Sequence, residues 1–225
     1  MNSLKVRYND LLEFDPITGN QKTAFSLWDV GENLVLAGSA GTGKTFIAMY
    51  LALESLLEKS SLYDRIIVVR SVVAVREVGY LPGKLEEKTA VFETPYSNIV
   101  EELFDDNTVY DRLVHAEQIQ FETTSFIRGK TFERAIVIVD EMQNLNFHEL
   151  DSVMTRIGEN CRIIFCGDYL QSDFNREVDK LGLMKFLQVI DRMKDFTTVQ
   201  FGWEDIVRSG IVRDYIMTKE MMGIS

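Results

Sequence analysis

The sequence predicts an α/β fold in which a mostly parallel β-sheet is flanked by helices on both faces. Short apolar runs rich in β-branched residues recur along the chain, and stretches with helical spacing of apolar residues separate them. These runs are apolar throughout instead of alternating with polar residues, which is typical of strands buried on both faces. No linker-like tract or repeat interrupts the 225 residues, so we expect a single domain over residues 1–225 with a short N-terminal extension at residues 1–17.

Apolar runs predict the strands, and longer periodic stretches predict the helices. The expected strands are Asn33–Gly38, Arg65–Arg70, Ala135–Glu141, Cys161–Asp168 and Thr197–Phe201, with one or two further short strands around a glycine turn in residues 118–135. The expected helices are Thr45–Lys59, Phe147–Ile157, Glu177–Met193 and Val207–Glu220, with a helix-like stretch after the turn at Pro82-Gly83. Because ligands of parallel sheets bind at the carboxyl ends of strands, Gly38, Asp140 and Asp168 should lie at one edge.

Composition limits the classes of function. Apolar residues make up 46% of the chain, enough for a sizeable core. The net charge of -11 argues against a general nucleic-acid-coating protein, although it leaves room for a locally basic channel. The N-terminus lacks the apolar segment of a signal peptide, and no run approaches the roughly 18 apolar residues of a membrane helix. Cys161 and Cys166 share one apolar run and are expected to be buried thiols, so we expect a cytoplasmic protein without membrane contact.

The segment Gly38–Thr45, GSAGTGKT, matches the phosphate-binding pattern G-x-x-x-x-G-K-[ST]. A predicted strand precedes it and a predicted helix follows it, the setting in which backbone N–H groups and a helix N-terminus bind phosphate oxygens. Here Lys44 would reach the β- and γ-phosphates, and Thr45 would offer its hydroxyl to Mg²⁺. The expected nucleotide contacts are Gly38, Ser39, Ala40, Gly41, Thr42, Gly43, Lys44, Thr45 and Phe46.

Polar side chains follow two of the predicted strands. Asp140 and Glu141 end a buried run, and burying bare charge is costly, which a metal ion would relieve. We expect Asp140 to hold Mg²⁺ and Glu141 to accept a proton from the attacking water. Asp168 and Gln171 follow another buried run, where Gln171 could hydrogen-bond the γ-phosphate or that water. The alternative for both groups is a solvated polar strand end.

Four longer segments resemble the PhoH-like family: VVRSVVAVREVGYLPGKLEEK, FIRGKTFERAIVIVDEMQN, MTRIGENCRIIFCGDYLQSD and DIVRSGIVRDY. The similarity spans roughly Thr18–Tyr215. It implies a RecA-like P-loop ATPase domain related to superfamily 1 helicases, with ATP or ADP and Mg²⁺ as ligands. In this resemblance Gln21 is similar to the adenine-reading glutamine. Asp140–Gln143 resembles the D-E-A-Q box with methionine in place of alanine, and Asp168 and Gln171 resemble helicase motif III.

A lone RecA-like domain has no second domain that would bring an arginine to the γ-phosphate. Arg208 and Arg156, and also Arg70 and Arg128, match arginines of the family pattern. The resemblance implies homo-oligomeric rings, commonly hexamers, in which Arg208 or Arg156 would enter the site of a neighbouring subunit. The alternative is that each arginine makes contacts only within its own chain.

The segment FIRGKTF is a candidate nucleic-acid contact. Arg128 and Lys130 flank Gly129, and Phe126 and Phe132 lie close by in the sequence. Basic side chains interleaved with aromatic ones can bind RNA or single-stranded DNA by charge and stacking. The alternative is a surface hairpin with a buried aromatic side.

These features predict an enzyme that hydrolyses ATP with Mg²⁺, forms a ring and couples turnover to remodelling of RNA or single-stranded DNA, as an RNA helicase does. The alternative is a nucleotide-gated assembly or regulatory module with slow hydrolysis and no nucleic-acid activity. A kinase fits less well, because Glu141 suits an activated water better than an acceptor pocket. The chain resembles minimal forms encoded by bacteriophages, which would place it in the host cytoplasm.

Overall fold

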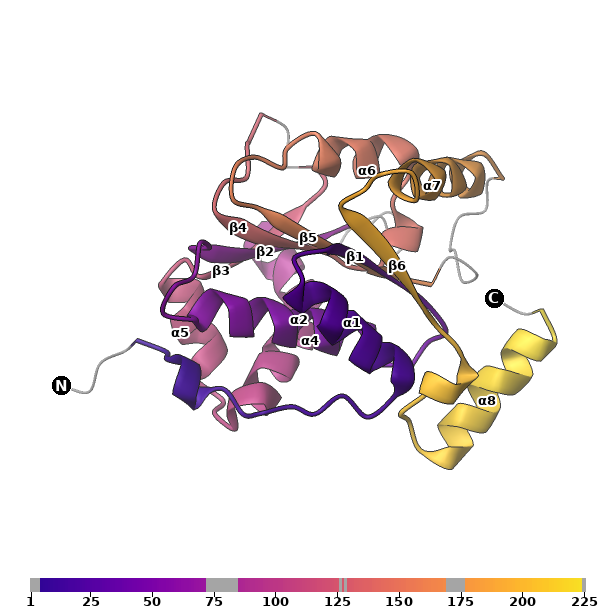
Figure 1. Cartoon of the computed structure of the whole chain (residues 1–225), viewed down its shortest axis with the longest axis horizontal. Helices are drawn as coiled ribbons and strands as arrows, with labels where there is room; N and C mark the ends of the chain where they lie inside the picture. The colour runs from indigo at the N-terminus through magenta and orange to yellow at the C-terminus, as the bar shows by residue number, and fades with distance from the viewer. Residues whose placement is uncertain (1–4, 72–84, 126, 128, 169–176, 224–225) are drawn as a thin grey trace.

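The computed structural model describes residues 5–71, 85–125, 127, 129–168 and 177–223. Within them, six parallel strands form one sheet in the order β3-β2-β4-β5-β1-β6 (Figure 1). The α/β class and the parallel sheet expected from the sequence are confirmed. The strands are β1 (Asn33–Gly38), β2 (Arg65–Arg70), β3 (Ile119–Thr123), β4 (Ala135–Val139), β5 (Arg162–Gly167) and β6 (Phe196–Phe201).

Helices cover both faces of the sheet (Figure 1). One face packs against α1 (Gly19–Asp29), α2 (Lys44–Leu57), α4 (Leu85–Phe104) and α5 (Val109–His115). The other packs against α6 (Phe147–Met154) and α7 (Glu177–Ile190). The last helix, α8 (Gly210–Met221), follows β6 and lies apart from both layers. The short 3-10 turns are η1 (Tyr8–Asp10), η2 (Met142–Asn144) and η3 (Trp203–Asp205).

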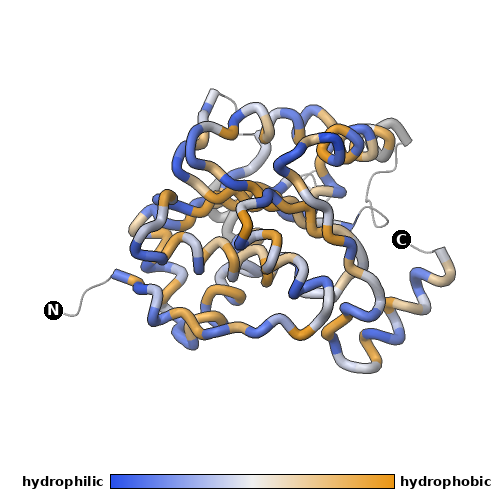
Figure 2. The backbone as a smooth tube through the Cα atoms, viewed as in Figure 1, coloured by the Kyte–Doolittle hydropathy of each residue, from blue (hydrophilic) through white to orange (hydrophobic). Residues whose placement is uncertain are grey.

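Strand β4 shows why the strand sequences are apolar throughout. All of its side chains are buried. Ile136 and Ile138 pack toward α2, whereas Val137 and Val139 pack toward α6 and α7, because successive side chains of a strand point to opposite faces. Burying a Val or Ile side chain stabilises the fold by about 1.5–3 kcal/mol. The sheet is accordingly the hydrophobic centre of the molecule (Figure 2).

The described part of the N-terminal extension packs against the body of the domain. Val6 is buried, and the Leu12 N–H donates a hydrogen bond of 2.9 Å to the carbonyl of Leu103. The Phe14 ring meets the Phe46 ring edge-on, with centroids 5.0 Å apart. This extension therefore brings an aromatic side chain to the beginning of α2.

Three helices were missed or only partly expected. Helix α1 buries only Gln21, Ala24 and Trp28, so its apolar spacing is weak. Helix α4 continues through Pro95, a residue that usually ends a helix, and only its beginning was expected. Helix α5 has only seven residues. Tertiary packing against the sheet therefore defines these helices more than their own sequences do.

Two element boundaries differ from the prediction for an identifiable reason. The strand expected to reach Glu141 ends at Val139, because Glu141 adopts a left-handed conformation with φ 51°. Helix α8 begins at Gly210 instead of Val207, whose N–H bonds the carbonyl of Gly41. In residues 118–134, the described part forms the strand β3 and an isolated bridge at Phe132, which agrees with the one or two short strands expected there.

The two cysteines are free thiols, as expected. Cys166 is buried, but Cys161 lies just before β5 and is only half-buried, which corrects the expectation that both are buried.

Among the described residues, no helix combines the length and apolar character needed to span a membrane.

Candidate nucleotide-binding site

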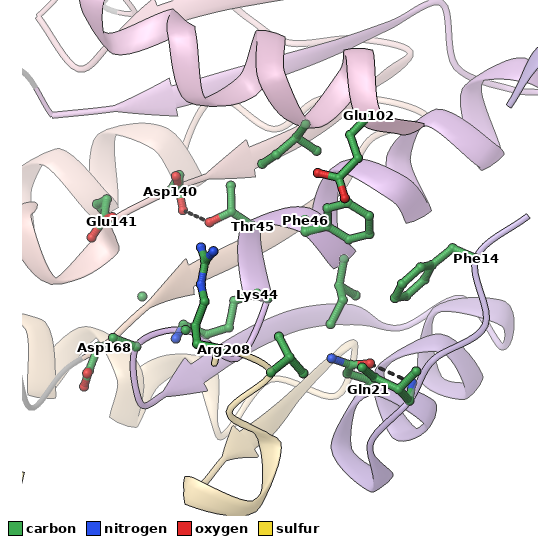
Figure 3. A pocket seen from close by; sticks show the side chains of 18 of the residues that line it. Phe14, Gln21, Lys44, Thr45, Phe46, Glu102, Asp140, Glu141, Asp168 and Arg208 are labelled. Atoms are coloured by element: carbon green, nitrogen blue, oxygen red, sulfur yellow. Dashed lines mark hydrogen bonds between the residues drawn. The ribbon is translucent and has the colours of Figure 1, made fainter. Parts of the chain in front are cut away.

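A cavity of about 660 Å³ lies at the carboxyl edge of the sheet (Figure 3). Residues that follow β1, β4 and β5 line it together, which confirms that the polar motifs after these strands converge. Its polar lining consists of Gln21, Lys44, Thr45, Glu102, Asp140, Glu141, Gln143, Asp168 and Arg208. Its remaining lining consists of Phe14, Ile17, Ala40, Gly41, Gly43, Phe46, Ile47, Ile99, Gly167 and Val207.

The loop after β1 is curled so that helix α2 begins at its end. Gly38 has a φ of 129° and lies against the backbone of Phe201, so no side chain fits there. Gly43 has a φ of 83° and is the residue before α2. Both conformations favour glycine. The free N–H groups in the first turn of α2 therefore face the cavity edge and form an anion-binding position.

Lys44 curls back into this loop. Its ammonium donates hydrogen bonds of 2.8 Å to the Gly38 carbonyl and 2.7 Å to the Ser39 carbonyl. Burial lowers the pKa of the Lys44 ammonium, and the nearby carboxylate of Asp168 opposes that shift. The charge thus sits inside the loop, where a phosphate group would be its natural counterion.

Asp140 and Asp168 are the two buried carboxylates among the lining residues of the cavity. Asp140 is 5% exposed, and its Oδ1 accepts a hydrogen bond of 2.9 Å from the Thr45 hydroxyl. Its Oδ2 accepts a hydrogen bond of 2.8 Å from the hydroxyl of Tyr96, which is fully buried. A hydroxyl and a carboxylate beside a phosphate-binding loop are oxygen ligands of the kind Mg²⁺ prefers. Thr45 and Asp140 therefore fit the metal role expected of them.

Glu141 is half-buried at the cavity wall. Its left-handed backbone turns the chain away from the sheet immediately after Asp140. Its carboxylate accepts a hydrogen bond from the Gln143 amide and lies 4.0 Å from the Arg70 guanidinium. Burial, and then the negative charge of Asp140, raise the pKa of Glu141. A raised pKa makes this carboxylate a better proton acceptor.

Gln143 connects the ends of two strands, a role that the sequence did not reveal. Its Nε2 donates to Glu141, and its Oε1 accepts a hydrogen bond of 3.0 Å from the Asp168 N–H. Gln143 is buried, as is Asp168. The side chain therefore fixes the position of the predicted base relative to the end of β5. Its place in the D-E-M-Q segment was the one signal that could have identified it.

Gln21 lies in the cavity wall and is 2% exposed. Its Oε1 accepts a hydrogen bond of 2.8 Å from the Ile17 N–H (Figure 3), and its Nε2 donates a longer one of 3.4 Å to the Thr42 carbonyl. The Gln21 amide thus ties α1 to the phosphate-binding loop, next to the position where it was expected to read a base.

The end of the cavity near Gln21 is aromatic. Figure 3 shows Phe14 and Phe46 at this end, with Glu102 of α4 beside Phe46, and Ile99 of the same helix also lines the cavity. Of these, only Phe46 was expected from the sequence, since the others lie outside every recognisable motif. An apolar, aromatic wall with one carboxylate acceptor suits a purine base.

Arg208 lies in the cavity of its own chain. Its Cγ packs against Gly41, where a Cβ would lie 2.9 Å away. The preceding Val207 N–H donates a hydrogen bond of 3.1 Å to the Gly41 carbonyl. Figure 3 shows the Arg208 guanidinium directed into the cavity, toward the side where Thr45 and Asp140 lie. This placement favours action within one subunit over action on a neighbour.

Other predicted residues lie away from the cavity. Arg156 donates to the carbonyls of Ile127 at 2.6 Å and Ser152 at 2.7 Å, and it does not line the cavity of its own chain. Lys130 pairs with Glu122 at 2.5 Å. Gln171, Phe126 and Arg128 lie outside the described residues.

Phe132, the described aromatic neighbour of Lys130, is 3% exposed and packs into the core beneath α6. It is therefore not available for stacking on a base. The described part of the segment has the buried aromatic side of the alternative interpretation, but its described residues form a turn and an isolated parallel bridge instead of a hairpin. A nucleic-acid contact at Lys130 would first have to break its ion pair with Glu122.

Comparison with known proteins agrees with this geometry. The family described as PhoH-like protein matches residues 13–220. The protein PhoH of Escherichia coli (strain K12) is 38% identical over 176 residues, which cover 77% of this chain and 49% of that protein. A PhoH-like protein of Synechocystis sp. is 33% identical over 184 residues, which cover 81% of this chain and 55% of that protein. The chain therefore spans about half the length of these curated relatives.

Among solved structures, the large terminase of a thermophilic bacteriophage shares the fold. One crystal form has a TM-score of 0.53 at 10% sequence identity and covers 92% of this chain and 50% of the terminase. Another form, in complex with ADP, has a TM-score of 0.52 at 11% identity with the same coverage. These similarities agree with the expected RecA-like P-loop fold. Since the family match extends over nearly all of the chain, the protein belongs to the PhoH-like family.

Proposed function

We propose that this protein binds ATP with Mg²⁺ and hydrolyses it to ADP and phosphate. One observation carries the proposal: Thr45 and Asp140 meet at 2.9 Å beside the phosphate-binding loop, and Glu141, whose pKa is raised, is the next residue. A phosphate-binding loop alone would hold a nucleotide. A metal-ligand pair followed by a proton acceptor adds what hydrolysis requires.

The residues divide the nucleotide between them. The loop N–H groups and Lys44 hold the β- and γ-phosphates, and the aromatic end with Phe14 and Phe46 holds the base. The Gln21 amide lies between them and could exchange its hydrogen bonds with Ile17 and Thr42 for bonds to an adenine edge.

In the chemical step, Thr45 and Asp140 would hold Mg²⁺, which neutralises charge on the β- and γ-phosphate oxygens when bound. Glu141 accepts a proton from a water whose oxygen attacks the γ-phosphorus. The bond between that phosphorus and the bridging oxygen breaks, and the electron pair leaves with ADP. Gln143 keeps Glu141 oriented through its hydrogen bond to the carboxylate. Arg208 would stabilise the developing negative charge from within the same chain.

The proposal also includes assembly into a hexameric ring and coupling of turnover to RNA or single-stranded DNA. It places the protein in the cytoplasm, or in the host cytoplasm if the chain is encoded by a bacteriophage. The ring is supported by α8, which buries no residue and leaves Ile211 81% and Tyr215 69% exposed. Nucleic-acid coupling is supported by the resemblance to helicase motor domains.

A nucleotide-gated assembly module is the second candidate, because the same helix touches the phosphate-binding loop. The Ser39 hydroxyl of the loop donates a hydrogen bond of 3.0 Å to Glu220 of α8. A change in the loop on binding nucleotide could therefore reach the exposed apolar residues Ile211 and Tyr215.

Steady-state ATP turnover with and without RNA, combined with a mass measurement in nucleotide, separates these candidates. If the protein is the proposed ATPase, it turns over ATP, RNA raises the rate of turnover, and Lys44→Ala abolishes it. An assembly module changes mass with nucleotide but turns over slowly regardless of RNA. A parent protein that binds no nucleotide would contradict both.

A further inference from the structure

Tyr96 is a residue that no motif identified, yet it contacts the centre of the site. It lies in α4, and its hydroxyl donates a hydrogen bond of 2.8 Å to Oδ2 of Asp140, 44 residues away in sequence. The side chain is fully buried, and its ring packs at 5.9 Å from the ring of Phe121 on β3. The phenol is thus held by the core on one side and touches the proposed metal ligand on the other.

The hydrogen bond between Tyr96 and Asp140 can have only one donor. A phenol is protonated at neutral pH and a carboxylate carries no proton there, so the Tyr96 hydroxyl is the donor and Asp140 is the acceptor. The carboxylate receives a second hydrogen bond on Oδ1 from Thr45. A carboxylate on a short side chain rotates readily about its last bond, since that torsion has a broad energy profile. Donors at both oxygens fix the plane of the Asp140 carboxylate.

We propose that Tyr96 is a positioning residue for the magnesium site: by holding Oδ2 of Asp140, it keeps Oδ1 facing Thr45 and the phosphate-binding loop. This inference rests on the proposed function, because it requires a metal–nucleotide complex. Hydrogen bonds to ligating groups commonly account for about 10- to 100-fold in metal affinity.

Helix α4 gives this contact a wider consequence. Ile99, one turn after Tyr96, and Glu102, two turns after it, line the same cavity, and Figure 3 shows Glu102 beside Phe46 at its aromatic end. One helix therefore contacts both the proposed metal ligand and the proposed base position.

The test compares ADP binding by calorimetry in excess Mg²⁺ and in EDTA for the parent, Tyr96→Phe and Tyr110→Phe. Tyr110 is the matched control, since it is a buried tyrosine of the same apolar cluster that does not line the cavity. For Tyr96→Phe, we expect the Mg²⁺ concentration that gives half of the metal-dependent gain in ADP affinity to rise about tenfold or more. Affinity in EDTA should stay within about twofold, and Tyr110→Phe should match the parent in both conditions.

A Mg²⁺ requirement that is unchanged in Tyr96→Phe would overturn the inference. An equal loss of ADP affinity with and without metal would also overturn it, because such a loss would indicate a purely structural role for Tyr96. If Tyr96→Phe does not yield folded protein, Tyr96→Met fills the space without a hydroxyl and must show the same raised requirement. A parent that binds no ADP would defeat the proposed function and the inference together. A parent with metal-dependent binding that Tyr96→Phe retains in full would defeat the inference alone.

Discussion

The two sides of the phosphate-binding loop are built differently. On the sheet side, Thr45, Asp140 and Tyr96 form a chain of hydrogen bonds in which Asp140 is 5% exposed and Tyr96 is fully buried. On the outer side, the loop meets Arg208 and Glu220 from a C-terminal segment whose helix, α8, buries no residue. The buried side has the features of a fixed metal site, whereas the outer side is attached through a few surface contacts.

The two sides should therefore differ in how readily they open. Segments with few buried apolar contacts open at lower free energy than core segments. The contacts that hold α8 there include the Ser39–Glu220 hydrogen bond, a bond of 2.5 Å from the Trp203 indole to the same carboxylate, and packing of Ile216 on Gly41. The proposed metal ligands should therefore stay in place while α8 can detach and return.

The largest expected effect comes from the outer side. Arg208→Ala should lower ATP turnover about 10³-fold or more, because an arginine at the γ-phosphate is worth that much in related chemistry. Turnover is measured at saturating ATP, with Arg213→Ala as the control, since Arg213 is an exposed arginine of the helix that follows.

Mixing Arg208→Ala with Lys44→Ala then decides which subunit supplies the arginine. Action within one chain predicts no recovery of turnover in the mixture, because no subunit carries both residues. Recovery would show that Arg208 reaches a neighbouring site, and the cavity contact with Gly41 would then belong to a different state of the chain.

On the buried side, Glu141→Gln should lower turnover about 10²- to 10⁴-fold, because it removes the proton acceptor while keeping the shape of the side chain. ADP affinity should change little, since Glu141 is not expected to hold the diphosphate. Glu159→Gln, at an exposed carboxylate, is the control. Equal losses of ADP affinity and turnover would mean that Glu141 supports binding instead of proton transfer.

The pH profile of turnover should reflect the environment of Glu141. Because burial and Asp140 raise its pKa, the acidic limb should lie above the range of an ordinary glutamate, and turnover should fall as the pH drops through that raised pKa. Arg70→Gln removes a guanidinium that favours the charged carboxylate, so the limb should move to still higher pH. If the acidic limb of the turnover profile lies at the same pH in Arg70→Gln as in the parent, the group that titrates is not Glu141.

A substitution on the buried side of the loop should lower the free energy of unfolding more than a substitution on the outer side. Tyr96→Phe should lower the free energy of unfolding by about 1–3 kcal/mol, because it leaves a buried carboxylate with one hydrogen bond fewer. Glu220→Gln should cost less than about 1 kcal/mol, because that carboxylate is only partly buried and its replacement still accepts a hydrogen bond. Urea titration measures both, and the reverse order would contradict the comparison.

The smallest expected effect is at the exposed face of α8. Ile211→Ser should change the free energy of unfolding by no more than about 0.5 kcal/mol, since the side chain is 81% exposed. If α8 forms contacts between subunits, the same variant should lower the mass measured in nucleotide. A large loss of monomer stability would show that this face packs against the chain itself.

The sequence by itself determined the central layout of the protein. The strands are apolar because both faces of the sheet are covered, and that requirement is visible in every run such as β4. The phosphate-binding loop and the Asp140-Glu141 pair were also predictable, because each is a short contiguous pattern at a strand end. Local spacing is sufficient for features whose chemistry lies within a few neighbouring residues.

Only the tertiary structure decided which distant residues complete the site. Tyr96, Phe14 and Gln143 gain their roles from side-chain contacts, and Arg208 reaches its own chain's cavity because Val207 bonds the loop at Gly41. Most of these contacts join segments tens of residues apart. Their formation depends on the shape of the packed core, which local periodicity does not encode.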